Sequence, residues 1–476
     1  MRTAVTLAVT LIMAGCAALP HSDGNIAIKS IDKYASEQSF APPAPATSTT
    51  AWPADEWWKT YGDAQLDQLV DEALVGSPTL AIADARLRRA QSLVDVAGSA
   101  NKPQISANTS ATEQKQSYNY LTPPGFTPRG WNDYGRATLD FSWDLDFWGK
   151  NRASIAAAIS EAQAARAEAA QARLTLSSSI ASAYAELARE YSALDTATAA
   201  REVRGKTADL IKQRFDNGLE TLASLRQVES RRAGADADVL ANEEQLALQR
   251  NRIAALIGVG PDRGLTITRP TIDFTRSFAL PNHLAAELVG RRPDLAAARL
   301  RAEAAAGRVG QARAAFYPNI NLNALIGVQS LSLDMLTKEG SSLGSIGPAL
   351  SLPLFTGGRL RAQLRGAEAE YAEAVSLYDR TVVQALQDVA DVAVSQRALG
   401  PQLTRVSEAV EAARESWRIQ NNRYSGGLAT YLEVLTAEDY LLSNLRTQSD
   451  LQSRSLTLDV ALTRALGGGY VGEKRL

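Results

Sequence analysis

The fold is indicated by one stretch of the chain, Ala137-Thr138-Leu139-Asp140-Phe141-Ser142-Trp143-Asp144-Leu145-Asp146-Phe147. Apolar and polar residues alternate along it, which is typical of a β-strand, whose successive side chains point to opposite faces. One face is apolar and aromatic, while the other carries Asp140, Asp144 and Asp146. A strand between lipid and a water-filled lumen has this pattern. We therefore expect the three aspartates to line the lumen of a membrane barrel.

An edge strand of a water-soluble sheet is the alternative interpretation of this stretch. Aromatic residues gather around it, however, as they do at the two interfaces of a membrane barrel. Of the 7 Trp, 14 Tyr and 9 Phe in the chain, nine residues lie between positions 118 and 148. They are Tyr118, Tyr120, Phe126, Trp131, Tyr134, Phe141, Trp143, Phe147 and Trp148. The membrane strand is therefore favoured.

The chain contains an internal repeat. Residues 214–221, Arg-Phe-Asp-Asn-Gly-Leu-Glu-Thr, recur as residues 423–430, Arg-Tyr-Ser-Gly-Gly-Leu-Ala-Thr. Prolines and leucines upstream of each stretch also match in order and spacing. Residues ~66–258 and ~281–467 are therefore predicted to be two copies of one unit.

Each unit is predicted to contain a helix, a β-hairpin, a very long helix, a tight turn and a return helix. The hairpins are expected within residues 103–147 and 318–355. Of the 48 residues from 153 to 200, 19 are alanine, the strongest helix former. Gly218 and Gly427 are expected to end the long helices, because glycine readily takes the left-handed conformation of a helix cap.

Two further features of the helices are expected. Apolar residues spaced seven apart from Leu66 to Val94 predict a single amphipathic helix at the start of the first unit. In the second copy, Gly400-Pro401 are expected to interrupt the long helix, because proline removes a backbone hydrogen bond and clashes with the preceding turn.

The first residues resemble a bacterial lipoprotein signal. Arg2 precedes an apolar run that is too short to span a bilayer, which needs ~20 apolar residues. The run ends in Ala14-Gly15-Cys16, and the chain has 1 cysteine. We expect cleavage after residue 15 and lipidation of Cys16. Residues 16–56 are polar and proline-rich, and they are expected to form a tether.

Composition argues against several classes of protein. The chain has 50 basic and 52 acidic residues, a net charge of −2, whereas nucleic-acid binders are usually basic. With 2 His and 1 Cys, we expect no disulfide framework, no metal site and no cofactor. The segment Gly340–Gly344 matches the nucleophile pattern G-x-S-x-G. It lies between predicted strands, and no histidine follows His283, so an enzyme is not expected.

The two hairpins together supply only four strands, which cannot close a membrane barrel. Open strand edges cannot be satisfied in lipid, so the barrel must be shared between chains. Two chains would give eight strands, whose interior is filled by side chains. Three chains would give twelve strands and leave room for a conduit.

Four stretches of the two copies carry a family resemblance. They are Arg291-Arg292-Pro293-Asp294-Leu295, Ala314-Ala315-Phe316-Tyr317-Pro318, Asp146-Phe147-Trp148-Gly149, and Arg423-Tyr424 through Leu432-Glu433-Val434-Leu435. The chain resembles the TolC-like outer-membrane efflux factors, in their NodT-like lipoprotein branch. The resemblance implies a mainly α chain that forms a homotrimer, with a twelve-stranded β-barrel in the outer membrane and a twelve-helix α-barrel in the periplasm. It also implies two partners, a periplasmic adaptor (membrane fusion protein) and an inner-membrane pump of the resistance-nodulation-division type.

The resemblance further implies roles for residues at the two turns. The periplasmic gate would be formed by Tyr424, Leu432, Glu433 and Thr436. The turns that dock with the adaptor would present Gly218, Leu219, Gly427 and Leu428.

The expected organisation follows from the signal, the repeat and the resemblance. It comprises a signal peptide (1–15), a tether (16–56), a first repeat (57–260), a linker (261–280), a second repeat (281–469) and a tail (470–476). The expected function is that of an outer-membrane exit duct in a tripartite efflux system. The alternatives are the outer-membrane duct of a type I protein secretion system and a surface-anchored coiled-coil structural protein.

Overall fold

The computed structural model describes residues 27–29, 33–34, 52–119, 125–126, 128–272, 288 and 290–472. Cys16 and the predicted signal peptide lie outside these residues. The described chain divides into two compact units, each assembled from separate segments. The first consists mainly of Leu87–Ala164 and Ala298–Tyr378, and the second of Lys29–Arg86, Ala165–Ala297 and Asp379–Leu476.

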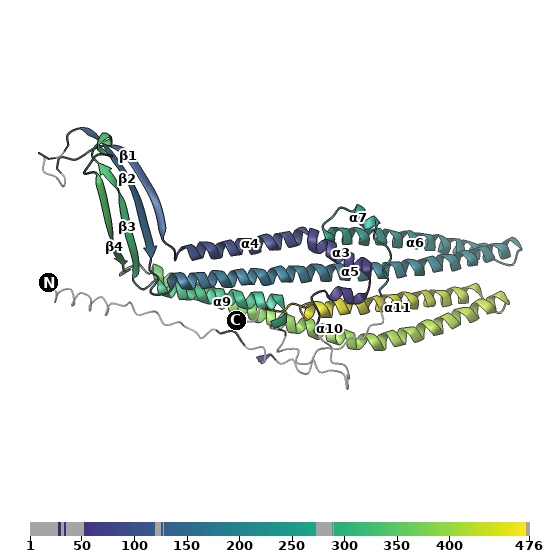
Figure 1. Ribbon diagram of the computed structural model, residues 1–476. Coiled ribbons are helices and arrows are strands. Elements are labelled where there is room, and N and C mark those ends of the chain that lie inside the picture. Colours follow the sequence, from purple (N-terminus) through teal and green to yellow (C-terminus); the bar gives the residue numbers. More distant parts are fainter. Residues whose placement is uncertain are drawn as a thin grey trace. The chain divides into compact units, whose positions relative to one another are not determined.

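The first unit contains one antiparallel sheet of four strands in the order β1-β2-β3-β4 (Figure 1). The strands lie within the ranges expected for the two hairpins. They are β1 (Gln104–Lys115), β2 (Trp131–Asp144), β3 (Asn319–Ser330) and β4 (Ser342–Ser351). β2 and β3 are hydrogen-bonded neighbours, so the hairpin of one repeat continues the sheet of the other.

One face of this sheet is apolar, and no described part of the chain covers it. Leu139 of β2 pairs with Ile326 of β3, and Ala324, two residues away on the same face, pairs with Ile346 of β4. The side chains of Ile326 and Ile346 are 67% and 79% exposed. Contiguous apolar surface of this kind marks an interaction site for protein or membrane. The alternation in 137–144 therefore produces the two-faced strand that the sequence predicts.

The sheet is followed by helices of great length. In the first repeat, α5 (Lys150–Asp216) and α6 (Leu222–Ile257) flank one turn. In the second repeat, α9 (Pro293–Ala314) precedes β3, and α10 (Arg359–Ser425) and α11 (Tyr431–Ala465) flank the second turn. None of the helices in the described part of the chain is long and apolar enough to cross a membrane.

The predicted interruption at Gly400-Pro401 is wrong, because α10 runs through Pro401 without a break. Proline lacks a backbone N–H and so removes one hydrogen bond of the helix. The helical turns on either side of Pro401 keep their backbone hydrogen bonds. Neighbouring residues of α10 are also held by packing. Leu399 is buried, and Ser407 accepts a hydrogen bond from Gln448 of α11 at 3.1 Å.

The single helix predicted from Leu66 to Val94 is also wrong. The structure has two helices there, α3 (Ala64–Gly76) and α4 (Pro78–Ser99). Ser77 between them is extended, with φ −69° and ψ 125°, because the ring of a following proline disfavours the helical conformation. The seven-residue spacing of apolar residues therefore continues from α3 into α4, although the helix is interrupted at Ser77.

The second unit has an apolar core that includes Trp58, Leu69, Ile180 and Ile253. Its polar anchor is Asp63, the N-cap of α3, which accepts from the backbone of Gln65 at 2.9 Å and of Leu66 at 3.3 Å. The other carboxylate oxygen of Asp63 accepts from the Tyr184 hydroxyl of α5 at 2.9 Å. One aspartate thus joins a helix start to the long helix.

Candidate gate at the helical turns

The two long helices end in the same way. Gly218 after α5 and Gly427 after α10 have φ +73° and +74°, the left-handed conformation that glycine adopts without steric cost. The backbone N–H of Leu219 donates to Arg214 at 2.8 Å, and that of Leu428 donates to Arg423 at 2.7 Å. The predicted ends of both helices are therefore confirmed.

Tyr424 connects the end of α10 with the first turn. Its side chain is 3% exposed, and its hydroxyl donates to Oε1 of Glu220 at 3.0 Å. The guanidinium of Arg214 lies 5.0 Å from the centre of the Tyr424 ring, a cation–π distance. Burial, and then the hydrogen bond to Glu220, raise the pKa of Tyr424 to about 12. The hydroxyl therefore keeps its proton at physiological pH.

Apolar packing surrounds this hydrogen bond. A cluster of side chains from α5, α6, α10 and α11 fills the space between the two helical pairs. Its buried members are Ala208, Ile211, Leu225, Val228, Tyr424, Tyr431, Val434 and Leu435. The ends of the two repeats are therefore joined by a dry contact as well as by a hydrogen bond.

Glu433 forms a capping box at the start of α11. Its Oε1 accepts from the backbone N–H and the hydroxyl of Thr430, both at 3.1 Å, and its Oε2 lies 3.5 Å from Nη1 of Arg423. The hydrogen bond from the Thr430 backbone is the largest cause that lowers the pKa of Glu433. The carboxylate is thus held ionised and in a fixed rotamer. The sequence signal for this role is Thr-x-x-Glu at 430–433.

Leu432 and Thr436 share one exposed side of α11. Leu432 is 63% exposed, and the Thr436 hydroxyl donates back to the carbonyl of Leu432 at 2.8 Å. Neither side chain belongs to the buried cluster within the chain. Of the four gate residues expected from the resemblance, the structure therefore buries Tyr424 and leaves Leu432 and Thr436 uncovered.

A buried ion pair lies near the residues expected to form the gate, and it was not anticipated from the sequence. Glu438 of α11 is 2% exposed, and its Oε1 accepts from Nε of Arg204 of α5 at 3.1 Å. Asp439 accepts from Arg231 of α6 at 3.0 Å. Burial raises the pKa of Glu438, and the hydrogen bond from Arg204 opposes that rise. Since 234 residues separate Glu438 from Arg204, no local sequence pattern indicates the pair.

The three aspartates expected in the barrel lumen occupy different surroundings. Asp140 accepts from Asn108 at 2.8 Å and from Thr138 at 2.9 Å. Asp144 ends β2 and lies on the same face, because residues two and four apart share a face.

Asp146 lies beyond the end of β2, so its assignment to the strand is wrong. Its carboxylate accepts from the backbone N–H groups of Asn151 at 3.1 Å and Arg152 at 2.9 Å, at the start of α5. Burial favours the neutral acid, but these hydrogen bonds outweigh it, and the pKa of Asp146 is lowered. The carboxylate therefore stabilises the helix N-terminus.

The turns expected to dock a partner expose apolar side chains. Leu219 and Leu428 follow the two cap glycines, and Leu428 is 74% exposed. Leu222 at the start of α6 is exposed as well. Among the described residues, no group of three or more His, Cys, Asp or Glu side chains is arranged to hold a metal ion.

Comparison with known proteins gives consistent matches along the chain. A family model described as outer membrane efflux protein matches residues 69–259 and 284–468. The fusaric acid resistance protein FusA of Burkholderia cepacia is 38% identical over 76% of this chain and 68% of its own length. The multidrug resistance outer membrane protein MdtP of Escherichia coli K12 is 32% identical over 89% of this chain and 88% of its own length.

The fold also matches solved structures. The crystal structure of the outer membrane protein VceC from Vibrio cholerae has a TM-score of 0.83 and 50% sequence identity. The match covers 88% of this chain and 100% of VceC.

Proposed function

We propose a gated exit route for this chain, which belongs to the outer membrane efflux protein family and is an outer-membrane efflux channel. The resemblance to the TolC-like family is thus confirmed, as are the outer-membrane location and the mainly helical fold with a membrane sheet. A trimeric barrel is consistent with this family. The proposal concerns how the channel is closed, what opens it and which partners it uses.

The proposed channel is a homotrimer anchored by lipid at Cys16. It receives cargo from an inner-membrane pump of the resistance-nodulation-division type through a periplasmic adaptor. Relatives named for resistance to fusaric acid and to multiple drugs support small toxic organic compounds as cargo. The polar face of the sheet, with Asp140 and Asp144, lines the lumen, while the apolar face contacts lipid.

The hydrogen bond from Tyr424 to Glu220 is the observation on which the gate proposal rests. It ties the end of α10 to the turn between α5 and α6, 204 residues away in the chain. With this bond intact, the helical pair α10–α11 stays against α5–α6. Moving α10 and α11 outward must break the bond and expose the buried Tyr424 side chain. Both costs favour the closed state.

The constriction is assigned to the start of α11. Three copies of Leu432, Glu433 and Thr436 would converge on the axis of the trimer. Glu433 is held ionised by the Thr430 capping box, so a ring of three carboxylates would attract cations and repel anions. The adaptor opens the gate if it binds the open form better than the closed form.

The docking surface is assigned to Leu219 and Leu428 beside Gly218 and Gly427. The experiment compares Leu428→Asp with Leu240→Asp, since Leu240 is a similarly exposed leucine on α6 away from the turns, 66% exposed against 74% for Leu428. Purified protein in planar bilayers should show a higher conductance when the adaptor encoded with it is added. Leu428→Asp should abolish that increase and keep the basal conductance, while Leu240→Asp should behave as wild type. Equal responses of both variants would reject the docking assignment.

A further inference from the structure

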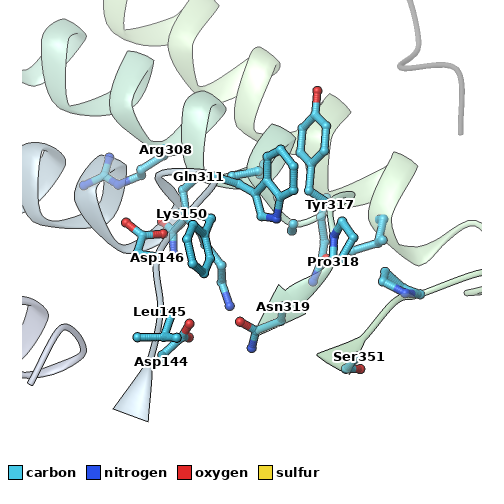
Figure 2. A pocket seen from close by; sticks show the side chains of 18 of the residues that line it. Asp144, Leu145, Asp146, Lys150, Arg308, Gln311, Tyr317, Pro318, Asn319 and Ser351 are labelled. Carbon is cyan, nitrogen blue, oxygen red and sulfur yellow. The ribbon is translucent and has the colours of Figure 1, made fainter. Parts of the chain in front are cut away.

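A cavity of about 530 Å³ lies where the strands meet the helices of the first unit. Figure 2 shows Asp144, Asn319 and Ser351 at the strand ends, and Lys150 and Arg308 from the helices above them. The volume is within the range of ~300–1,000 Å³ that small-molecule sites usually have. No part of the proposed gate or docking surface contributes to it.

Strand register places this cavity on the polar side of the sheet. Asp144 pairs with Asn321 of β3, so Asn319, two residues before Asn321, shares that face. Asn319 in turn pairs with Ser351 of β4. Asp144 shares the face of Asp140, opposite the apolar residues that include Ile326 and Ile346. Because we propose that this face lines the lumen, the cavity would open to the lumen side of the channel wall.

The cavity contains two cationic side chains, Lys150 and Arg359, that form no ion pair with the described residues. Among the described residues, no hydrogen bond or ion pair engages the Lys150 side chain. Within the part of the chain that the structure describes, the Arg359 guanidinium forms one hydrogen bond, to the neutral Gln363 at 3.3 Å. By contrast, Arg308 is neutralised by Glu161 at 2.6 Å, and Asp146 is occupied by the N-terminus of α5.

One free carboxylate also lines the cavity. Asp144 is not paired with any side chain that the structure describes. Among the described residues, the cavity thus has two unpaired cations, Lys150 and Arg359, and one unpaired carboxylate, so its net charge is positive. An anionic ligand is therefore favoured over a cationic one.

An aromatic wall completes the cavity. The Trp148 indole stacks on the Tyr317 ring, with centroids 5.1 Å apart and planes inclined by 17°. Half of the Trp148 surface remains exposed, so a second planar group can pack against it. Offset stacking of aromatic rings adds roughly 0.5–1.5 kcal/mol beyond area burial.

We propose that this cavity binds a small planar organic anion on its way through the channel. The acid group contacts Lys150 and Arg359, and the ring packs on Trp148. The proposal rests on the efflux function and specifies a class of cargo for it. A site in the wall raises the local concentration of such anions at the base of the membrane sheet.

The experiment uses the intact protein in lipid nanodiscs and 2-naphthoate as the probe, with 2-naphthylmethylammonium as its cationic counterpart. Binding is measured by isothermal titration. Wild type should bind the anion more tightly than the cation. Lys150→Met should weaken naphthoate binding about tenfold, the loss typical of a charge-assisted contact. Trp148→Leu should weaken the binding of both probes, and Asp144→Asn should strengthen binding of the anion.

The matched control is Lys338→Met. Lys338 follows β3, at the opposite end of the strand from Asn319, and pairs with the exposed Asp334. The Lys338→Met variant should bind naphthoate as tightly as wild type does. Equal affinities of Lys150→Met and Lys338→Met, or a preference of wild type for the cation, would overturn the proposal. Conductance of the same wild-type preparation in planar bilayers tests the duct separately, so a conducting protein without naphthoate binding rejects the anion site alone.

Discussion

Nε of Arg204 on α5 donates to Oε1 of Glu438 on α11 at 3.1 Å, and water reaches little of either side chain. Asp439, the next residue of α11, pairs with Arg231 of α6. The two neighbouring carboxylates of α11 thus bind α5 and α6 of the first repeat. A movement of α11 that opens the proposed gate would have to separate these ion pairs or carry α5, α6 and α11 together.

The buried pair predicts an asymmetric effect of substitution. Arg204→Met leaves the Glu438 carboxylate buried without its cation and should destabilise the protein by about 3–5 kcal/mol. The double variant Arg204→Met with Glu438→Leu should recover most of that loss, because no charge remains buried. Thermal unfolding of wild type, both single variants and the double variant measures the coupling. Additive losses would show that the two side chains do not interact.

Glu438 also predicts a pH dependence. Its pKa is raised in the folded protein above the ordinary 4.5, so the folded state holds this proton more tightly than the unfolded state. Its contribution to stability should be largest below pH 4.5 and should decrease as the pH rises through the folded pKa. The stability difference between wild type and Glu438→Gln, measured from pH 4 to pH 8, isolates this group. A difference that does not change with pH would contradict the raised pKa.

Tyr424→Phe should loosen the gate. It removes the hydroxyl that donates to Glu220 but keeps the ring, and one such hydrogen bond contributes about 1.5–3 kcal/mol when its acceptor is charged. Single-channel conductance or open probability should therefore rise. Tyr440→Phe is the control, since Tyr440 is exposed on α11. Because the pKa of Tyr424 is about 12, the effect should be constant from pH 6 to pH 9. Unchanged gating in Tyr424→Phe would show that this hydrogen bond does not hold the gate closed.

Two substitutions of Glu433 should separate its charge from its capping role. Glu433→Gln keeps the Thr-x-x-Gln form of the capping box but removes the charge, so cation preference should fall while stability is kept. Glu433→Ala removes both the charge and the capping group, so it should lower the thermal stability as well as the cation preference. Leu432→Ala should widen the pore if Leu432 is the constriction. Reversal potentials in a salt gradient measure the selectivity, and unaltered values in all three variants would show that the start of α11 is not the gate.

Substitution of Asp146 and of Asp144 should affect protein stability differently, although the two residues are only two positions apart. Asp146→Ala removes the acceptor of two backbone N–H groups at the start of α5 and should destabilise the protein by about 1 kcal/mol. Asp144→Ala should leave stability near that of wild type, because Asp144 forms no hydrogen bond to the described side chains. Thermal unfolding compares the two variants directly. Equal losses would mean that the contacts of Asp146 contribute nothing measurable.

Cys16 should be lipidated, since it follows Ala14-Gly15 at the end of the apolar run. Metabolic labelling with radioactive palmitate should mark wild type and not Cys16→Ser. The channel should still insert without the lipid, because a closed barrel is itself a membrane anchor. Equal labelling of the two proteins would refute the modification.

Local sequence determined the elements that depend on near neighbours. The alternation from 137 to 144 decides which strand face is polar, because side chains of a strand point to alternate sides. Gly218 and Gly427 determine where the long helices end, because they take the left-handed conformation most easily. The capping box of Thr430 and Glu433 is likewise determined by four consecutive residues.

Tertiary structure alone decided which distant side chains meet. Arg204 and Glu438 are far apart in the chain, and their contact depends on how α5 and α11 pack, which no local period specifies. Tyr424 finds Glu220 for the same reason. Asp146 continues the strand alternation but caps a helix, because the backbone turns after Asp144 and brings the N–H groups of α5 to its carboxylate. Pro401 stays helical because a lost hydrogen bond in a 67-residue helix is outweighed by the packing of its neighbours.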